Sequence, residues 1–193
     1  MNEVPKNSFC PSNKDEWREW LEKNHKKEES IWLIFYKKKS ANFNLSWSQA
    51  VDEAICFGWI DSVKKSLDEE RYIQYFTKRK PTSIWSKINK NKVETLTKQG
   101  LMSDAGLKCV RIAKENGSWT ILDTVEKLII PEDLERKFQQ YPNSKDYFQS
   151  LSVVIRKRLL YWVISAKKKD TREKRIGEIA EMAGKKLLPK NFR

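Results

Sequence analysis

The order in which helical and strand patterns follow one another constrains the fold of this chain most. A helical pattern at residues 13–24 precedes an apolar, aromatic run of strand length at residues 31–36, and a second helix begins with a capping box at Ser46. Two alternating runs within residues 59–77 flank a polar turn, which predicts a β-hairpin. From residue 83 onward the patterns are helical. This order predicts an α+β fold: a small, mostly antiparallel sheet with packed helices, followed by a helical C-terminal module.

The chain is expected to divide into an N-terminal α+β region at residues 1–117 and the C-terminal helical module at residues 131–193. Residues 118–130 would connect them, and the alternative is that both parts pack as one domain. At the start of the chain, residues 1–11 resemble a loose arm. The helices expected after the hairpin cover residues 83–99, 103–116, 131 onward, 143–150, 151–168 and 171–183.

The register of the hairpin follows from its turn. A turn centred near Glu69 would place Trp59 opposite Arg79 and Asp61 opposite Thr77. Asp61 and Arg79 would then be diagonal neighbours on adjacent strands, within reach of each other's side chains.

Basic residues outnumber acidic residues by 39 to 26, which gives a formal net charge of +13. The excess is concentrated in two segments. Residues 78–98 hold seven basic residues and one acidic residue, a net +6, and residues 156–193 hold thirteen and four, a net +9. Such concentration indicates an anionic partner, which could be nucleic acid, a phosphorylated metabolite or an anionic lipid surface. The alternative is a lysine-rich surface that meets only solvent.

The cysteine and histidine content argues against disulfide, zinc and haem chemistry. Cys10, Cys56 and Cys109 are odd in number and far apart, with no CxxC pair, which is typical of reduced thiols. His25 is the single histidine and lies in a charged run, so we expect no metal and no cofactor. No apolar stretch approaches the roughly 18 residues of a membrane span, and the N-terminus has no apolar segment of signal-peptide length. We therefore expect a cytoplasmic protein.

Three polar side chains stand where helix physics disfavours them. Asn89 falls with Ile88 on the apolar stripe of its predicted helix, where it either bonds a loop carbonyl or points into a pocket. Arg172 falls in the first turn of a helix that Asp170 would cap, where the macrodipole disfavours cations, and Arg175 follows it by three residues. The two arginines either hold an anion at the helix start or pair with acids elsewhere in the core.

Glu53 and Cys56 lie three residues apart on one predicted helix. Carboxylates beside a thiol could serve acid–base or nucleophilic chemistry. No histidine lies nearby in the sequence to activate the thiol, so the alternative is a buried structural cysteine. Ser83 and Ser86 are expected to cap the start of the helix that follows the hairpin.

Several motifs stand in order along residues 9–185. The run EAICFGWID at residues 53–61 resembles the EALCFGWID signature of the YdeI/OmpD-associated family, also labelled a bacteriocin-protection family. Arg79 and the segment SIWSKIN at residues 83–89 resemble its PRxxxSxWSxxN motif. Further likenesses to GRM…AG and to YxxWIxxAKxxETRxxRI fall at residues 100–106 and 161–176.

Three positions depart from these motifs. Lys78 replaces a proline, Leu101 replaces an arginine, and Asp170 replaces a glutamate. Leu101 argues against an anion-binding role at that position, whereas Asp170 keeps the charge. The resemblance implies no settled reaction or ligand, because the family name comes from genetic association. The positions that match its motifs include the residues singled out above on physical grounds.

We expect a cleft between the hairpin and the C-terminal helices that binds a small anionic ligand. Arginines would clamp the ligand, tryptophans would form the walls, and polar side chains would orient it. Two alternatives remain: nucleic-acid binding by a basic face with stacking aromatics, and an enzyme with Glu53 or Asp61 as its base. The predicted ligand-binding residues are Trp59, Asp61, Arg79, Ser83, Trp85, Asn89, Trp162, Lys167, Arg172 and Arg175.

Overall fold

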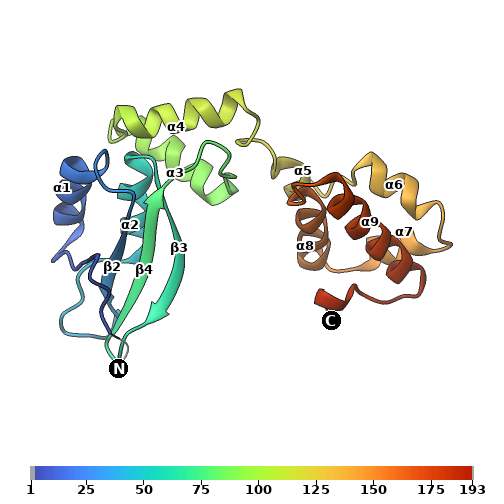
Figure 1. Ribbon diagram of the computed structural model, residues 1–193, viewed down its shortest axis with the longest axis horizontal. Helices are drawn as coiled ribbons and strands as arrows, with labels where there is room; N and C mark the ends of the chain where they lie inside the picture. Colours follow the sequence, from blue (N-terminus) through green and yellow to red (C-terminus); the bar gives the residue numbers. More distant parts are fainter. Residues whose placement is uncertain (1–2, 193) are drawn as a thin grey trace. The chain divides into compact units, whose positions relative to one another are not determined.

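Two units, each with its own apolar core, make up the chain (Figure 1). The computed structural model describes residues 3–192. The N-terminal unit covers residues 1–119 and the C-terminal unit covers residues 120–193. The division falls within residues 118–130, the stretch expected to connect the two regions, and the assignment of two domains at residues 1–117 and 131–193 stays a prediction. The predicted α+β class is confirmed, with a sheet in the N-terminal unit and helices in both units.

The sheet has four strands in the order β1-β2-β4-β3. The pairs β2–β4 and β3–β4 are antiparallel, as predicted, whereas β1 runs parallel to β2. The expectation of a loose arm at residues 1–11 is wrong at β1, because two residues are too few to show a periodicity. The strands are β1 (Ser8–Phe9), β2 (Ser30–Tyr36), β3 (Trp59–Ser66) and β4 (Arg71–Lys78).

The predicted hairpin register holds near the turn and is wrong at the far end. Ser66 pairs with Tyr72, as a turn centred near Glu69 requires. A bulge between Asp61 and Lys64 then shifts the pairing by one residue. Trp59 therefore lies opposite Lys78 rather than Arg79, and Asp61 lies opposite Phe76 rather than Thr77.

Serine and asparagine caps set the starts of the four N-terminal helices. Ser46 forms the predicted capping box with Gln49. The helix expected from Ser83 starts four residues later, because Ser86 is its N-cap and residues 79–86 form a loop. The helices are α1 (Lys14–Asn24), α2 (Trp47–Cys56), α3 (Lys87–Lys98) and α4 (Asp104–Glu115).

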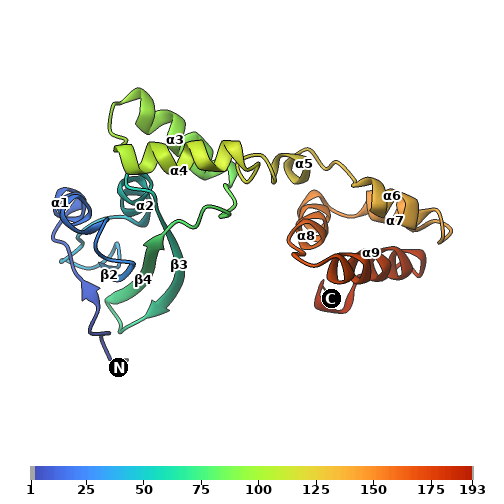
Figure 2. The ribbon, with the colours of Figure 1, turned by 45° about the horizontal axis from the view of Figure 1, so that its top comes forward.

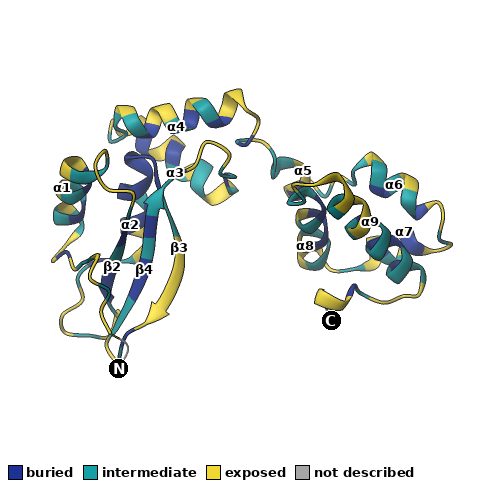
Figure 3. Cartoon of the chain, viewed as in Figure 1, coloured by how far each residue is buried: buried dark blue, intermediate teal, exposed yellow. Residues whose placement is uncertain are grey.

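One face of the sheet packs against α1 and α2 (Figures 1 and 2). Alternate residues of β2, such as Leu33 and Phe35, face this core and are fully buried, together with Trp17 and Trp59. The opposite face carries a small cluster that includes Ile73 and consists only of strand and hairpin residues. The turn end of β3 is exposed (Figure 3).

The C-terminal unit is helical. Asp170, expected to cap the last helix, lies inside its first turn, because the helix begins at Lys169 and Lys168 is the N-cap. None of the helices in the described part of the chain is long and apolar enough to cross a membrane. The helices are α5 (Asp123–Glu126), α6 (Glu132–Phe138), α7 (Ser144–Ser150), α8 (Val153–Ile164), α9 (Lys169–Gly184) and a final 3-10 turn, η1 (Lys190–Phe192).

The C-terminal end of α2 docks against the start of α4. The Cys56 carbonyl oxygen accepts hydrogen bonds from the Ser103 backbone N–H at 3.0 Å and the Ser103 hydroxyl at 2.7 Å. Gly58 has φ +74°, a left-handed conformation that glycine adopts without cost. A Cβ on Gly106 would lie 2.2 Å from the Cys56 carbonyl oxygen, so the helix crossing requires a residue without a side chain.

Replacing Gly106 with alanine should therefore destabilise the N-terminal unit. Overpacking of this kind lowers the free energy of unfolding by about 1–3 kcal/mol. Seven of the eight tryptophans lie in this unit, so urea unfolding followed by tryptophan fluorescence reports on it. We expect the midpoint of Gly106→Ala to fall well below that of the unmodified protein.

Gly177→Ala is the matched control. Its added Cβ would meet only the Lys137 side-chain carbon at 4.0 Å, within α9. The higher helix propensity of alanine then predicts that the free energy of unfolding of the C-terminal unit rises by about 0.5–1 kcal/mol. Unfolding monitored by circular dichroism measures this change. An unchanged midpoint in Gly106→Ala would contradict the close α2–α4 contact.

Candidate functional site

The residues predicted to bind a ligand divide between the two units. Trp59, Asp61, Arg79, Ser83, Trp85 and Asn89 belong to the N-terminal unit, and Trp162, Lys167, Arg172 and Arg175 belong to the C-terminal unit. Glu53, the possible acid or base, lies on α2 in the N-terminal unit. Each group is therefore described within its own unit.

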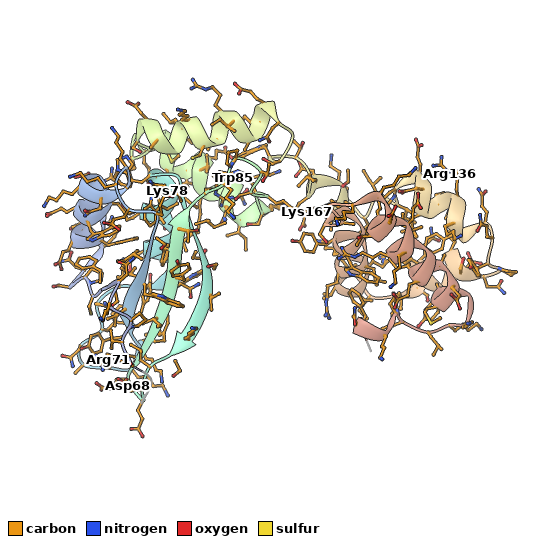
Figure 4. The ribbon with its side chains drawn as sticks, viewed as in Figure 1. Asp68, Arg71, Lys78, Trp85, Arg136 and Lys167 are labelled. Atoms are coloured by element: carbon orange, nitrogen blue, oxygen red, sulfur yellow. The ribbon has the colours of Figure 1, made fainter. Side chains whose placement is uncertain are left out.

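Arg79 is the central feature of the N-terminal group. It follows β4 directly, and its backbone N–H donates to the Gly58 carbonyl at 2.9 Å. Only 6% of the residue is exposed. Its Nη1 donates to the Ile84 carbonyl at 3.1 Å, and its guanidinium carbon lies 3.6 Å from the centre of the Trp85 ring. Figure 4 shows Lys78 and Trp85 at the same end of the hairpin, away from Asp68 and Arg71 at the turn.

Two nitrogens of Arg79 are left without a hydrogen-bond acceptor. Nε and Nη2 are buried and have no hydrogen-bond partner among residues 3–192. Burial lowers the pKa of Arg79 to about 10, while Cys109 and Asp61 act in the opposite direction. The guanidinium is thus still charged at neutral pH. A buried cation without a paired carboxylate is unfavourable unless another group compensates its charge.

Asp61 and Trp59 do not supply that compensation by hydrogen bonding. The Asp61 carboxylate accepts hydrogen bonds from Trp47 Nε1 and Gln74 Nε2, each at 3.0 Å. Trp59 is fully buried, and its indole Nε1 has no partner among the described residues. Its ring meets Trp20 edge-on with the centroids 5.8 Å apart.

Ser83 and Asn89 take positions set by the later start of α3. The Ser83 backbone N–H donates to the Lys80 carbonyl at 2.9 Å within the loop, so Ser83 is not the helix cap. Asn89 is half-buried, and its backbone N–H donates to the Ser86 hydroxyl at 3.2 Å. Ile88, expected on the same apolar stripe, is 64% exposed. The expected stripe is therefore wrong at Ile88.

Glu53 is 2% exposed and is held by two cations. Arg18 Nη1 lies 2.7 Å from one of its carboxylate oxygens, and Lys14 Nζ lies 3.6 Å from the other. Sequence reasoning missed Arg18, although its place on the helix beside Trp17 was a signal that it could face α2. Arg18 also donates to the Leu101 carbonyl at 3.1 Å.

Cys56 lies beside this ion pair. Burial, followed by the Glu53 charge, raises the pKa of Cys56 to about 11. Its thiol is fully buried. A thiolate is the reactive form of cysteine, so this environment favours the structural alternative over nucleophilic chemistry.

In the C-terminal unit, Arg172 pairs with Asp133, an acid that sequence reasoning did not single out. Nε and Nη2 of Arg172 donate to the two carboxylate oxygens at 2.6 and 3.0 Å. Hydrogen bonds from Arg172 lower the pKa of Asp133. The pair is bidentate and uses the side edge of the guanidinium, formed by Nε and Nη2.

Arg175 binds Trp162 rather than an acid. Its Nη1 donates to the Trp162 carbonyl at 2.6 Å and to the Ser165 hydroxyl at 3.1 Å. Its guanidinium carbon lies 5.3 Å from the Trp162 ring centre. Lys167 is exposed on the turn between α8 and α9.

The three cysteines should react with iodoacetamide at different rates at pH 8. A pKa of about 11 gives Cys56 about a hundredfold less thiolate than a thiol with the ordinary value of 9.0. We expect Cys10, which is exposed, to be modified first, and Cys56 to be modified only after unfolding. Peptide mass spectrometry over time measures the rates. Rapid labelling of Cys56 in the folded protein would contradict a structural role.

Comparison with known proteins supports two family assignments. Residues 9–109 match a domain of unknown function, DUF8412. Residues 127–186 match the family described as Bacteriocin-protection, YdeI or OmpD-Associated. No curated protein and no solved structure matches the chain. The chain belongs to the DUF8412 family, whose match spans residues 9–109, and the expected resemblance to the YdeI/OmpD-associated, bacteriocin-protection family is confirmed over residues 127–186.

Proposed function

We propose that the N-terminal unit binds a small oxyanion, a carboxylate or a phosphate, at the side edge of Arg79. The observation that carries the proposal is the pair of buried Arg79 nitrogens, Nε and Nη2, that have no acceptor among the described residues. These two N–H groups point in parallel and match the two oxygens of a carboxylate or phosphate. Arg172 uses the same two atoms to bind both oxygens of Asp133.

The surroundings of Arg79 favour an external anion, rather than a carboxylate of the protein, as the acceptor for its free N–H groups. Asp61 is engaged by Trp47 and Gln74, and Glu53 is engaged by Arg18 and Lys14. Trp85 forms an aromatic wall against the guanidinium, which fixes the plane of the fork. In this buried, low-dielectric environment, an anion would interact with the guanidinium charge of Arg79 more strongly than it would in water.

Access to the site requires movement of the loop at residues 79–86. This loop contains no helix or strand. Hydrogen bonds tie it to the rest of the unit, among them those from the Arg79 N–H to the Gly58 carbonyl at 2.9 Å and from Asn116 Nδ2 to the Pro81 carbonyl at 2.8 Å. The bond from Arg79 Nη1 to the Ile84 carbonyl closes the loop on itself. Trp85 is 1% exposed, so its packing in the core, more than these bonds, sets the free energy of the opening that would admit a small ion. A contribution from Trp162, Lys167, Arg172 and Arg175 of the C-terminal unit stays a prediction.

The test is isothermal titration calorimetry with sodium phosphate and sodium acetate at neutral pH, with ionic strength held constant by chloride. Arg79→Met removes the charged fork and keeps much of the apolar volume beside Trp85. Hydrogen bonds to charged groups contribute about 1.5–3 kcal/mol, so binding should weaken by about tenfold or more. Circular dichroism checks that the variant is folded.

Arg71→Met is the matched control, since it removes the same charge from a half-buried pair with Asp68 at the hairpin turn. It should leave the affinity unchanged. Absence of saturable heat in the unmodified protein, or equal affinity in Arg79→Met, would reject the proposal.

The pH dependence of acetate binding provides a separate prediction. Binding requires the protonated guanidinium, and the pKa of Arg79 is lowered to about 10. Affinity should therefore fall as the pH rises through about 10, where an ordinary arginine remains charged. An affinity that stays constant up to pH 11 would contradict a lowered pKa of Arg79.

A further inference from the structure

A groove between α3 and α4 forms a second candidate site in the N-terminal unit. It has a volume of about 570 Å³, which lies in the range of small-molecule sites. Its apolar lining comes from Val93 of α3, Leu107 and Val110 of α4, and Trp119. Views in Figures 1 and 2 both place α3 and α4 side by side.

Trp119 is held as a fixed platform. Its backbone N–H donates to the Ala113 carbonyl at 2.9 Å, and its ring packs against Trp85 with the centroids 5.1 Å apart. The ring is half-buried and lines the groove. Lys114 Nζ lies 5.4 Å from the ring centre. An indole face in a hollow, beside an ammonium group, is the arrangement on which nucleobases stack.

The rim of the groove is basic. Lys98 and Lys114 line it and are exposed, and its one acidic residue, Glu94, is paired with Lys98 at 2.8 Å. Of the seven basic residues in the segment at residues 78–98, Lys90 and Lys98 line the groove, so its lining holds three lysines and one glutamate. Such a rim attracts phosphate groups.

From these observations we infer that the α3–α4 groove binds a nucleotide, with its base on Trp119 and its phosphate at Lys98 and Lys114. An amphipathic peptide helix fits less well, because Val93 and Val110 are 6% and 7% exposed and leave only Leu107, at 43%, as an apolar anchor. A flat base needs one aromatic face rather than an apolar stripe. The nucleotide could be free or part of a single strand, since both present the same base and phosphate.

The inference does not depend on oxyanion binding at Arg79. Arg79 lies on Trp85 and is not among the residues that line the groove. Arg79→Met should therefore keep nucleotide binding even though it loses phosphate binding. The two proposals can fail separately.

The experiment measures binding of AMP by calorimetry and of a fluorescent oligothymidylate of about 12 nucleotides by anisotropy, using the full chain. Trp119→Ala should weaken binding by about 5- to 100-fold, and Trp119→Phe should restore most of it. Trp47→Ala is the control, because Trp47 is 44% exposed on α2 outside the groove. It should bind as the unmodified protein does.

A second variant keeps the test decisive if Trp119→Ala fails to fold. Lys98→Gln with Lys114→Gln changes only exposed side chains. This double variant should weaken binding of the single strand. It should also reduce the slope of the logarithm of the binding constant against the logarithm of the salt concentration by about 0.7 for each lysine. Saturable binding of AMP that Trp119→Ala weakens and Arg79→Met keeps supports a free nucleotide, and binding of the strand alone supports single-stranded nucleic acid. Binding of neither probe, or equal affinity in the folded variants and the unmodified protein, would overturn the inference.

Discussion

Removing a charged side chain from water costs free energy that another group must compensate, and this constraint shapes the polar interior of both units. Glu53 is compensated by Arg18 and Lys14 between α1 and α2. Asp133 compensates Arg172 between α6 and α9. Arg79 differs from both, because a carbonyl and an indole ring face its guanidinium while its side edge has no acceptor among the described residues.

The place of Arg79 is fixed by contacts at the end of α2. The left-handed Gly58 turns the chain from α2 into β3, and the Gly58 carbonyl then accepts from the Arg79 backbone. The close approach of Gly106 to Cys56 holds α4 against the same corner. The strand end that carries Arg79 therefore rests on packed backbone, whereas the loop after it is free of regular structure. A rigid anchor beside a loop without regular structure is an arrangement that would suit a site that opens for its ligand.

Local patterns predicted the parts of the fold that local physics determines. The capping box at Ser46 and the hairpin turn near Glu69 involve neighbouring residues, and both hold. The bulge after Asp61 has no local signature, so the strand register was wrong beyond it. The two-residue β1 strand depends on pairing with β2, which no periodicity in residues 1–11 could reveal.

The candidate site shows the same limit. Arg79 and Trp85 could be selected from the sequence, but their stacking arises from the loop between β4 and α3. Sequence position marked Arg172 as unusual in the first turn of its helix, yet its partner Asp133 lies on α6, 39 residues away. Partner identity at such distances is set by tertiary packing, which no spacing rule contains.

Trp85 connects the two proposed sites physically. One contact of its ring is with the Arg79 guanidinium at 3.6 Å, and another is with Trp119 at a centroid distance of 5.1 Å. Trp85 belongs to the loop that must open for an oxyanion to reach Arg79, so opening that loop would disturb the packing that supports Trp119. A ligand stacked on Trp119 would favour the closed loop, and thermodynamic linkage then requires that each ligand alter the affinity of the other. The sign of this coupling follows from which loop conformation each ligand needs, and the shared ring is the element through which it would act.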